Sequence, residues 1–370
     1  MLKQIKTNPM QISNEMVILK KTLFEMVLKE VCSMTQSKIL EEDREQAFHK
    51  SVAEKYFKIR ESLFINDFKP RSERLYHYTS PEGLIGILNS ENFVLRFSRF
   101  DCLNDVTEGI LAYKLFNEVI AELKNENLIS DQLYELAAQI KPEDGDFYII
   151  KLAKAEKVRT ETEKDENGLF WLNEDKYLCC FSEEPDSLPM WNYYTKGISA
   201  RGYNIGISKS SLQKRKHVYK GNELRIVKIL YKQETQKELI KKMMMEIQNE
   251  FSILGEQLAN TLMTEVLIEW RFLFKSECFA HEKEVRAILT VPTSLPEETK
   301  DVDAFKVRFR NNSGYVIPFI ELKFSKRSAQ IITVGPLLDY SSAVNGLKAL
   351  LSDGKYEWVD IVKTQIPNRY

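Results

Sequence analysis

The chain has 370 residues, 43% hydrophobic and 29% charged, which is enough to bury a core in one large domain or in two ordinary ones. Its 53 Lys and Arg residues against 54 Asp and Glu give a formal net charge of -1, so its whole surface is not built to bind nucleic acid or anionic lipid. This composition also excludes wholesale disorder.

Cysteine usage and hydropathy indicate the compartment. The five cysteines form no CxxC pair and no disulfide-like framework, which favours reduced thiols. No secretory signal opens the chain, and no apolar run approaches the ~18 residues that a membrane span needs. We therefore expect a soluble cytoplasmic protein. The four histidines have no metal-ligand spacing with a cysteine, so we expect no metal site.

The first part of the chain predicts helices. Apolar residues recur at helical spacing over residues 16–27 and again over 48–63. Pro70, among charged residues, is the best linker candidate. We therefore expect a helical extension over residues 1–70, which docks on the rest of the chain or on a protein partner, followed by a domain over residues 71–370.

Strands and helices are mixed after this linker. Ser80 and Pro81 are typical of an N-cap and a first helical residue, and Asp105 and Glu108 have capping-box spacing. Further helices are expected over 190–194, 239–254, 258–273 and 343–351. Strands are expected over 74–78, 92–97, 177–181, 203–207, 224–231, 284–290, 304–309, 316–322, 331–334 and 358–362. Without steady βα alternation, this order predicts an α+β fold with a mixed, mainly antiparallel (split) sheet and flanking helices.

The first candidate motif is the segment 76–83. Strand alternation places His77 on the face of Leu75, and Tyr78 on the opposite face. His77 and Thr79 precede a helix N-terminus, a place suited to a phosphate, and the imidazole there could bind a ribose hydroxyl. The alternative is a histidine whose ring is satisfied by a backbone carbonyl.

The second motif joins a strand end to aromatic residues. Ser182 ends the strand Cys179-Cys180-Phe181, and Trp191, Tyr193 and Tyr194 follow on a short helix. Aromatic planes there could clamp a flat ring by stacking. The alternative is that Trp191 and one tyrosine belong to an ordinary core, and that the two cysteines are buried structural thiols.

The third motif is the segment 281–289. Read as a strand, it places Glu282, Glu284 and Arg286 on one face and Val285 on the other. Such a face could hold a sugar hydroxyl and a phosphate, and a carboxylate there could stabilise positive charge that develops on a ribose carbon. The alternative is a solvated strand face with a surface ion pair.

Residues 209–242 form a local basic window in a nearly neutral chain. The window contains eleven Lys and Arg residues and three Glu residues. This excess of positive charge favours a phosphate-rich partner such as nucleic acid. The alternative is an ordinary solvated face.

Seven short pieces, in order, resemble the bacterial family of domain of unknown function 2971. They are Leu75 to Ser80, Leu103 to Asp105 with Glu108, Cys180 to Glu183, Asp186 with Met190, Trp191 and Tyr194, Gly202 to Ile207, Glu282 to Arg286, and Ile366 to Arg369. The pieces cover the chain from about residue 74 to its end. The family name implies no activity.

A looser resemblance is to ADP-ribosyltransferases, in which a histidine binds a ribose of NAD, aromatic residues pack on nicotinamide and a glutamate holds the reacting ribose. Carried over, it implies that His77 binds ribose beside Thr79, that Tyr193 or Tyr194 stacks, and that Glu284 is catalytic with Glu282 as its competitor. Ser182 could instead take the polar middle position.

Three functions follow as hypotheses. The first is an enzyme, an ADP-ribosyltransferase-like toxin or defence effector that uses NAD as its substrate and modifies a protein or nucleic acid. The second is a non-catalytic nucleotide- or nucleic-acid-binding module, and a metal-dependent nuclease is the weakest.

Overall fold

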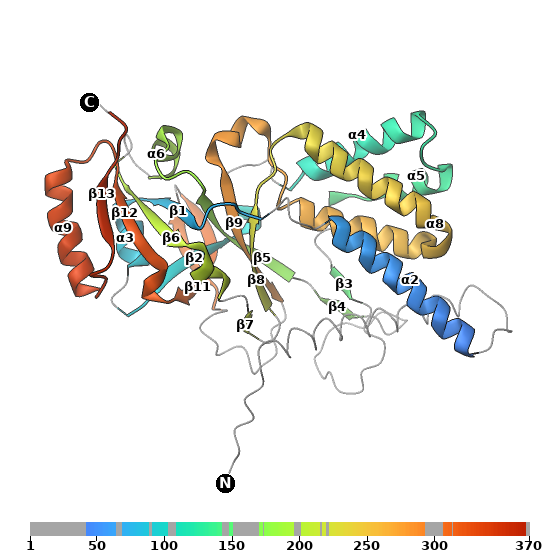
Figure 1. Cartoon of the computed structure of the whole chain (residues 1–370), viewed down its shortest axis with the longest axis horizontal. Coiled ribbons are helices and arrows are strands. Elements are labelled where there is room, and N and C mark those ends of the chain that lie inside the picture. The colour runs from blue at the N-terminus through green and yellow to red at the C-terminus, as the bar shows by residue number, and fades with distance from the viewer. Residues whose placement is uncertain are drawn as a thin grey trace, which may run out of the picture. The chain divides into compact units, whose positions relative to one another are not determined.

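A computed structural model describes most of the chain beyond residue 41 (Figure 1). The described residues are 42–63, 69–88, 91–102, 109–142, 148–150, 170–172, 174–195, 201–214, 217–219, 222–292, 306–312 and 314–367. The helix expected over 16–27, the capping box at Asp105 and Glu108, and part of the basic window lie outside them.

Two compact units, each drawn from three segments, make up the chain. The first contains residues 1–65, 112–174 and 237–270, and the second contains residues 66–111, 175–236 and 271–370. The first change of unit, at residue 65, falls near the expected linker at Pro70. The first unit nevertheless also contains residues 112–174 and 237–270. The helical part of the molecule is therefore not confined to an N-terminal extension.

The first unit is mainly helical. It contains α2 (Glu42–Leu63), α4 (Leu111–Asn125), α5 (Asp131–Ala138), most of α8 (Gln233–Trp270) and the hairpin of β3 (Tyr148–Ile150) and β4 (Phe170–Leu172). Arg60 of α2 binds Glu265 of α8 at 3.1 Å, and Lys237 of α8 binds Glu118 of α4 at 3.0 Å. These pairs join α2 and α4 to α8, whose apolar residues form the centre of the unit.

The second unit is built on an 11-stranded sheet, counted over the described residues. Its main path runs β10-β11-β2-β5-β1-β6-β12-β13, and β9, β8 and β7 branch from β5. The strands are β1 (Arg74–Thr79), β2 (Phe93–Arg99), β5 (Glu174–Ser182), β6 (Tyr203–Ser208), β7 (His217–Tyr219), β8 (Asn222–Lys228), β9 (Glu284–Pro292), β10 (Arg308–Asn312), β11 (Tyr315–Phe324), β12 (Ala329–Val334) and β13 (Asp360–Lys363). Neighbours on the main path are antiparallel except β12 and β13, which are parallel.

The sheet splits at β5. The amide of Glu183 donates to the carbonyl of Lys283 at 3.0 Å, and Lys176 binds Thr290, so β9 runs along one edge of β5. A strand has only two edges. Consequently β2, which pairs at Leu178, and β1, which pairs at Ser182, share the other edge and diverge between these two positions.

Short helices flank this sheet. They are α3 (Pro81–Ile87), α6 (Leu188–Tyr194), α7 (Lys209–Gln213), α9 (Tyr340–Asp353) and the 3-10 turns η2 (Phe100–Cys102), η4 (Glu277–Glu282) and η7 (Lys326–Ser328). Ser80 caps α3 as expected: its hydroxyl accepts from the amide of Gly83 at 3.2 Å. Pro81 is the first helical residue.

The α+β class is confirmed, and most expected elements are present with shifted ends. The helices expected over 239–254 and 258–273 are both present, since α8 contains two helices that meet at Gly255, whose backbone is not helical. Three expectations were wrong in detail. The strand expected over 304–309 is present only from Arg308, because Lys306 and Val307 lie outside it. The last expected strand begins two residues late, at Asp360. Glu282 lies in the turn η4 and not on β9, because Lys283 adopts a left-handed conformation (φ 43) that separates them.

The core of the sheet unit lies on one face of the sheet. Leu75, Phe181, Val285 and Ala287 belong to a single buried apolar cluster that also takes in residues of α3 and α9. The opposite face carries a smaller cluster, in which Tyr78 of β1 packs with Met190 and Trp191 of α6. Among the helices that the structure describes, none combines the length and apolar character needed to cross a bilayer.

Candidate functional site

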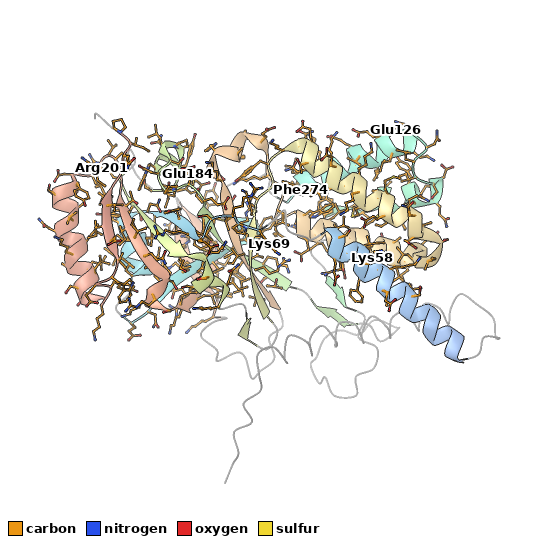
Figure 2. The ribbon with its side chains drawn as sticks, viewed as in Figure 1. Lys58, Lys69, Glu126, Glu184, Arg201 and Phe274 are labelled. Atoms are coloured by element: carbon orange, nitrogen blue, oxygen red, sulfur yellow. The ribbon has the colours of Figure 1, made fainter. Side chains whose placement is uncertain are left out.

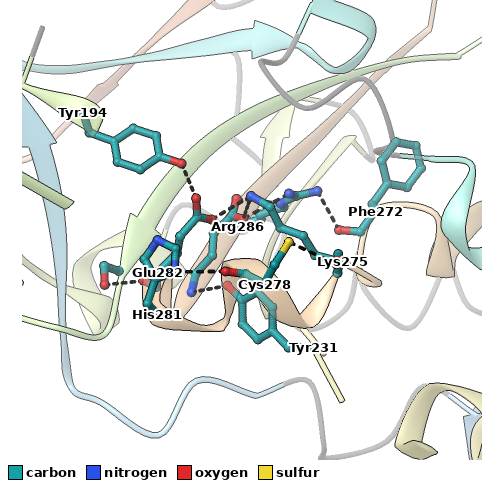
Figure 3. Close-up of polar contacts among 11 residues, drawn as sticks. Tyr194, Tyr231, Phe272, Lys275, Cys278, His281, Glu282 and Arg286 are labelled. Atoms are coloured by element: carbon teal, nitrogen blue, oxygen red, sulfur yellow. Dashed lines mark hydrogen bonds and ion pairs between the residues drawn. The ribbon is translucent and has the colours of Figure 1, made fainter. Parts of the chain in front are cut away.

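A buried network of charges lies where β9 begins (Figure 3). Glu284 accepts from Nε of Arg286 at 2.7 Å and from Nζ of Lys275 at 3.0 Å, and Arg286 also donates to the carbonyl of Phe272 at 3.1 Å. Glu284 is 5% exposed and Arg286 is 1% exposed. The alternative of a solvated strand face is therefore wrong, since these groups are turned into the protein.

Glu282 joins the same network from the turn η4. Its two carboxylate oxygens accept from the hydroxyl of Tyr194 at 2.5 Å and from Nζ of Lys275 at 2.7 Å. Lys275 therefore bridges both glutamates, and Tyr194 connects the network to α6 (Figure 3). Phe274, which precedes Lys275, is buried in the same unit (Figure 2). The second and third motifs thus meet through Tyr194 and Glu282, which are 88 residues apart in the chain.

Electrostatics keep Glu284 ionised. Burial by itself would raise the pKa of Glu284, but the positive charges of Arg286 and Lys275 outweigh it and hold that pKa at about 2. Burial and the neighbouring carboxylates raise the pKa of the Tyr194 and Tyr231 hydroxyls, so both phenols stay protonated. The network is thus a set of fixed charges with neutral phenol hydroxyls around them.

Ser182 supports the turn that carries Glu282. Its buried hydroxyl donates to the carbonyl of Glu282 at 2.6 Å and accepts from the amide of Glu184 at 3.0 Å. The hydroxyl of Tyr78 donates to the carbonyl of Glu184 at 2.9 Å. Both side chains hold the loop after β5. Their hydroxyls are fully used by backbone partners, so they position the site without lining it.

Trp191 and Tyr193 have opposite environments on α6. Trp191 is fully buried, packs edge-on against Tyr78 and donates to Asp186 at 2.7 Å, which is the core role that the alternative assigned to it. Tyr193 is 70% exposed, and its ring lies 6.1 Å from that of His281, next to Glu282 in the chain. Tyr193 thus presents an exposed aromatic ring near His281, the residue before Glu282.

His77 lies at the split of the sheet. Its Nδ1 is 2.9 Å from the carbonyl of Cys180, which faces the edge where β1 and β2 diverge. Burial lowers the pKa of His77, so the ring is neutral and Nδ1 is the donor. The His77 ring therefore satisfies a carbonyl of β5 between the positions at which β2 and β1 pair with that strand.

The structure does not bring His77 and Glu284 together on one face. His77 shares its face with Leu75, and its ring packs 5.7 Å from Phe181, on the side of the main core. Glu284 alternates with Val285, which belongs to that core, and so lies on the other face. Thr79, on the side of His77, is 8% exposed.

Two members of the network were missed by the sequence reasoning. Lys275 closes the apolar run Phe272-Leu273-Phe274, and a single charge at the end of such a run is a weak signal of a buried ion pair. Tyr231, whose hydroxyl accepts from the amide of Glu284 at 2.8 Å, gave no signal because its contact joins segments 53 residues apart.

The basic window does not form one free surface over its described residues. Lys209 binds Glu73, Lys228 binds Glu183, and Lys237 binds Glu118 and Glu122. Its residues are also divided between the two units. Among the described side chains, no group of three or more His, Cys, Asp or Glu is arranged to hold a metal ion.

Comparison with protein-family models gives a match to part of the chain. A family model described as protein of unknown function (DUF2971) matches residues 190–287. The matched segment runs from α6 to the start of β9 and so contains Tyr194, Lys275 and both glutamates of the network. This match supports the expected resemblance to that family. No curated protein and no solved structure matches the chain.

Proposed function

We propose that the sheet unit is ADP-ribosyltransferase-like and uses NAD as a substrate, with Glu282 as the carboxylate that acts on the ribose. The observation that carries this proposal is the position of Glu282: it is 4% exposed, both its oxygens are held, and it follows His281, whose ring lies near the exposed Tyr193. A role as a toxin or defence effector belongs to the same proposal.

The chemistry follows from the charge that develops on the substrate. The bond between the ribose carbon and the nicotinamide nitrogen breaks, and its electron pair leaves with nicotinamide, which becomes neutral. Positive charge then grows on the ribose carbon, and a fixed carboxylate in a water-poor site stabilises it. An oxygen or nitrogen of the acceptor bonds to that carbon and releases its proton to solvent.

The side chains around Glu282 have separate tasks in this proposal. Lys275 and Tyr194 fix the two carboxylate oxygens, so little reorganisation is needed when charge develops. Tyr193 offers the ring on which nicotinamide stacks. Glu284 is paired with both Lys275 and Arg286, and it serves to hold these cations in place. His77, on the other face, has no part in the proposed ribose contact.

The test is nicotinamide release from NAD by the purified full chain, with protein, nucleic acid and water as acceptors. Glu282→Gln keeps the shape of the side chain but removes its charge, and we expect it to lower the release rate by about 100-fold or more. Glu277→Gln, an exposed glutamate of the same turn, is the matched control and should keep the wild-type rate. Equal rates for Glu282→Gln and wild type would contradict the proposal.

One observation favours the non-catalytic alternative, a nucleotide- or nucleic-acid-binding module. The charges of Lys275, Glu282, Glu284 and Arg286 balance, and all four residues are nearly buried, as in a purely structural cluster. Calorimetric titration with NAD, AMP and RNA separates the two functions. Saturable binding with no nicotinamide release for any acceptor would favour the module over the enzyme.

A further inference from the structure

Three arginines gather on one face of the sheet at its β10 end. The register of β10, β11 and β2 pairs Arg308 with Phe319 and Phe319 with Ser98, and it pairs Arg96 with Glu321. Paired residues of neighbouring strands project from the same face. Arg310, two residues after Arg308, lies on this face as well, so strand pairing alone brings the three guanidinium groups together.

Two of these three cations share a single carboxylate, and the third pairs with none that the structure describes. Glu321 accepts from Nε of Arg96 and from Arg308, each at 3.0 Å. Arg310 forms no ion pair with any acidic side chain in the described ranges. Three positive charges and one negative charge leave the cluster with a local charge of +2, whereas the network around Glu284 is balanced.

Arg310 is the least satisfied member of this cluster. Its Nη2 donates to the hydroxyl of Ser98 at 2.9 Å, and its buried Nε meets no acceptor among the residues that the structure describes. Burial and the nearby charge of Arg96 lower the pKa of Arg310. An unmade hydrogen bond on a buried donor costs free energy, and the charge of Arg310 is not compensated by any carboxylate among the described residues.

The neighbouring side chains fix the geometry of the cluster. The guanidinium of Arg96 lies 5.1 Å from the ring centre of Phe319, a cation–π arrangement that holds its orientation. Arg96 and Arg308 are 44% exposed, so solvent and solutes reach them. Guanidinium groups in fixed planes match the oxygens of a phosphate better than flexible ammonium groups do.

We propose that Arg96, Arg308 and Arg310, with Ser98, form a binding site for a phosphate group of a small anionic ligand. The site is independent of the proposed action on NAD, because none of its residues belongs to the network around Glu282. Within it Glu321 acts as an internal competitor: it occupies donors of Arg96 and Arg308 that the ligand would otherwise use.

Calorimetry with pyrophosphate and inorganic phosphate at low ionic strength tests this assignment on the full chain. Arg310→Gln removes the unpaired charge and should weaken binding by at least about tenfold. Glu321→Gln removes the competitor and should strengthen binding by a similar factor. Arg327→Gln, an exposed arginine that stacks on Trp358, is the matched control and should bind as the wild type does.

Opposite signs for Arg310→Gln and Glu321→Gln are the signature of this site, since a general loss of folding would weaken both variants. Thermal unfolding without ligand shows whether each variant is folded. Absence of saturable binding by the wild type at millimolar phosphate, or equal affinities for wild type and Arg310→Gln, would overturn the proposal. Both outcomes are measured as phosphate binding, so they do not depend on whether the protein releases nicotinamide from NAD.

Discussion

Glu284 is held between Arg286 and Lys275 in the interior of the sheet unit, and this placement ties its charge to folding. Removing one partner of a buried ion pair leaves the other charge without compensation, which costs about 3–5 kcal/mol. We therefore expect Glu284→Gln to lower the free energy of unfolding by about that amount near neutral pH. Urea unfolding followed by tryptophan fluorescence measures it, and the exposed Glu277→Gln should change little.

The same residue predicts a pH dependence. The pKa of Glu284 is about 2 in the folded protein, against an ordinary value of 4.5 for an unfolded chain. The unfolded state binds the proton first as pH falls, so the stabilisation by the carboxylate is complete above pH 4.5 and is lost toward pH 2.

The difference in unfolding free energy between wild type and Glu284→Gln should therefore be constant above about pH 5 and should shrink steadily below it. Urea titrations of both proteins at several pH values give this difference directly. A difference that stays constant down to pH 3 would show that Glu284 has an ordinary pKa in the folded protein.

The strand patterns predicted the face of each residue, although the resemblance to ADP-ribosyltransferases implied that His77 and Glu284 act on one substrate. Alternation placed His77 with Leu75 and Glu284 opposite Val285, and the two apolar residues prove to share one core. The separation of His77 from Glu284 was therefore implicit in the strand patterns. The contacts of Lys275, Glu282 and Tyr194 could not be predicted, because a left-handed residue, Lys283, turns Glu282 out of the strand.

At the scale of elements, the kink in α8 depends on one glycine. Gly255 has φ 70 and ψ 171, a conformation that essentially only glycine adopts without strain. A Cβ atom there would meet no other atom within 4 Å, so any cost of substitution is conformational.

Gly255→Ala should lower the free energy of unfolding by about 1–3 kcal/mol. Gly346, inside α9, also has open space where a Cβ atom would lie, but its φ is not positive. Gly346→Ala should therefore leave stability unchanged or raise it by up to about 1 kcal/mol. Thermal unfolding of both variants measures the contrast, and equal shifts would show that the backbone at Gly255 is not strained.

The pattern of elements was more predictable than their pairing. Local signals such as Ser80-Pro81 and the alternation in β1 and β9 reproduce the elements closely. A split sheet was expected in outline, but nothing local marks β5 as its branch point. That role depends on the pairing of Leu178 and Ser182 with different strands.

At the scale of the molecule, α2 belongs to a unit completed by much later segments. Val52, Tyr56, Ile59 and Leu63 are buried on α2, and Arg60 and Ser62 bind α8. A chain of residues 71–370 would expose the partner surface of this helix. We expect that fragment to lose cooperative thermal unfolding of its helical unit and to bind an apolar dye more strongly than the full chain.

Circular dichroism and dye fluorescence of the fragment and the full chain measure this effect. If residues 1–70 were a separable extension, the fragment would unfold at the temperature of the full chain and bind no additional dye. Sequence composition could not distinguish these cases, because an amphipathic helix has the same pattern whether it packs on its own chain or on a partner.

The interleaving of segments also has a consequence for synthesis on the ribosome. Residues near 50 emerge about 200 residues before those near 250 that cover them, a delay of about 10–40 s at ordinary translation rates. During that interval Lys55 and Arg60 of α2 have not met the α8 glutamates that they bind in the folded protein. A nascent chain must therefore keep α2 soluble until α8 has left the exit tunnel.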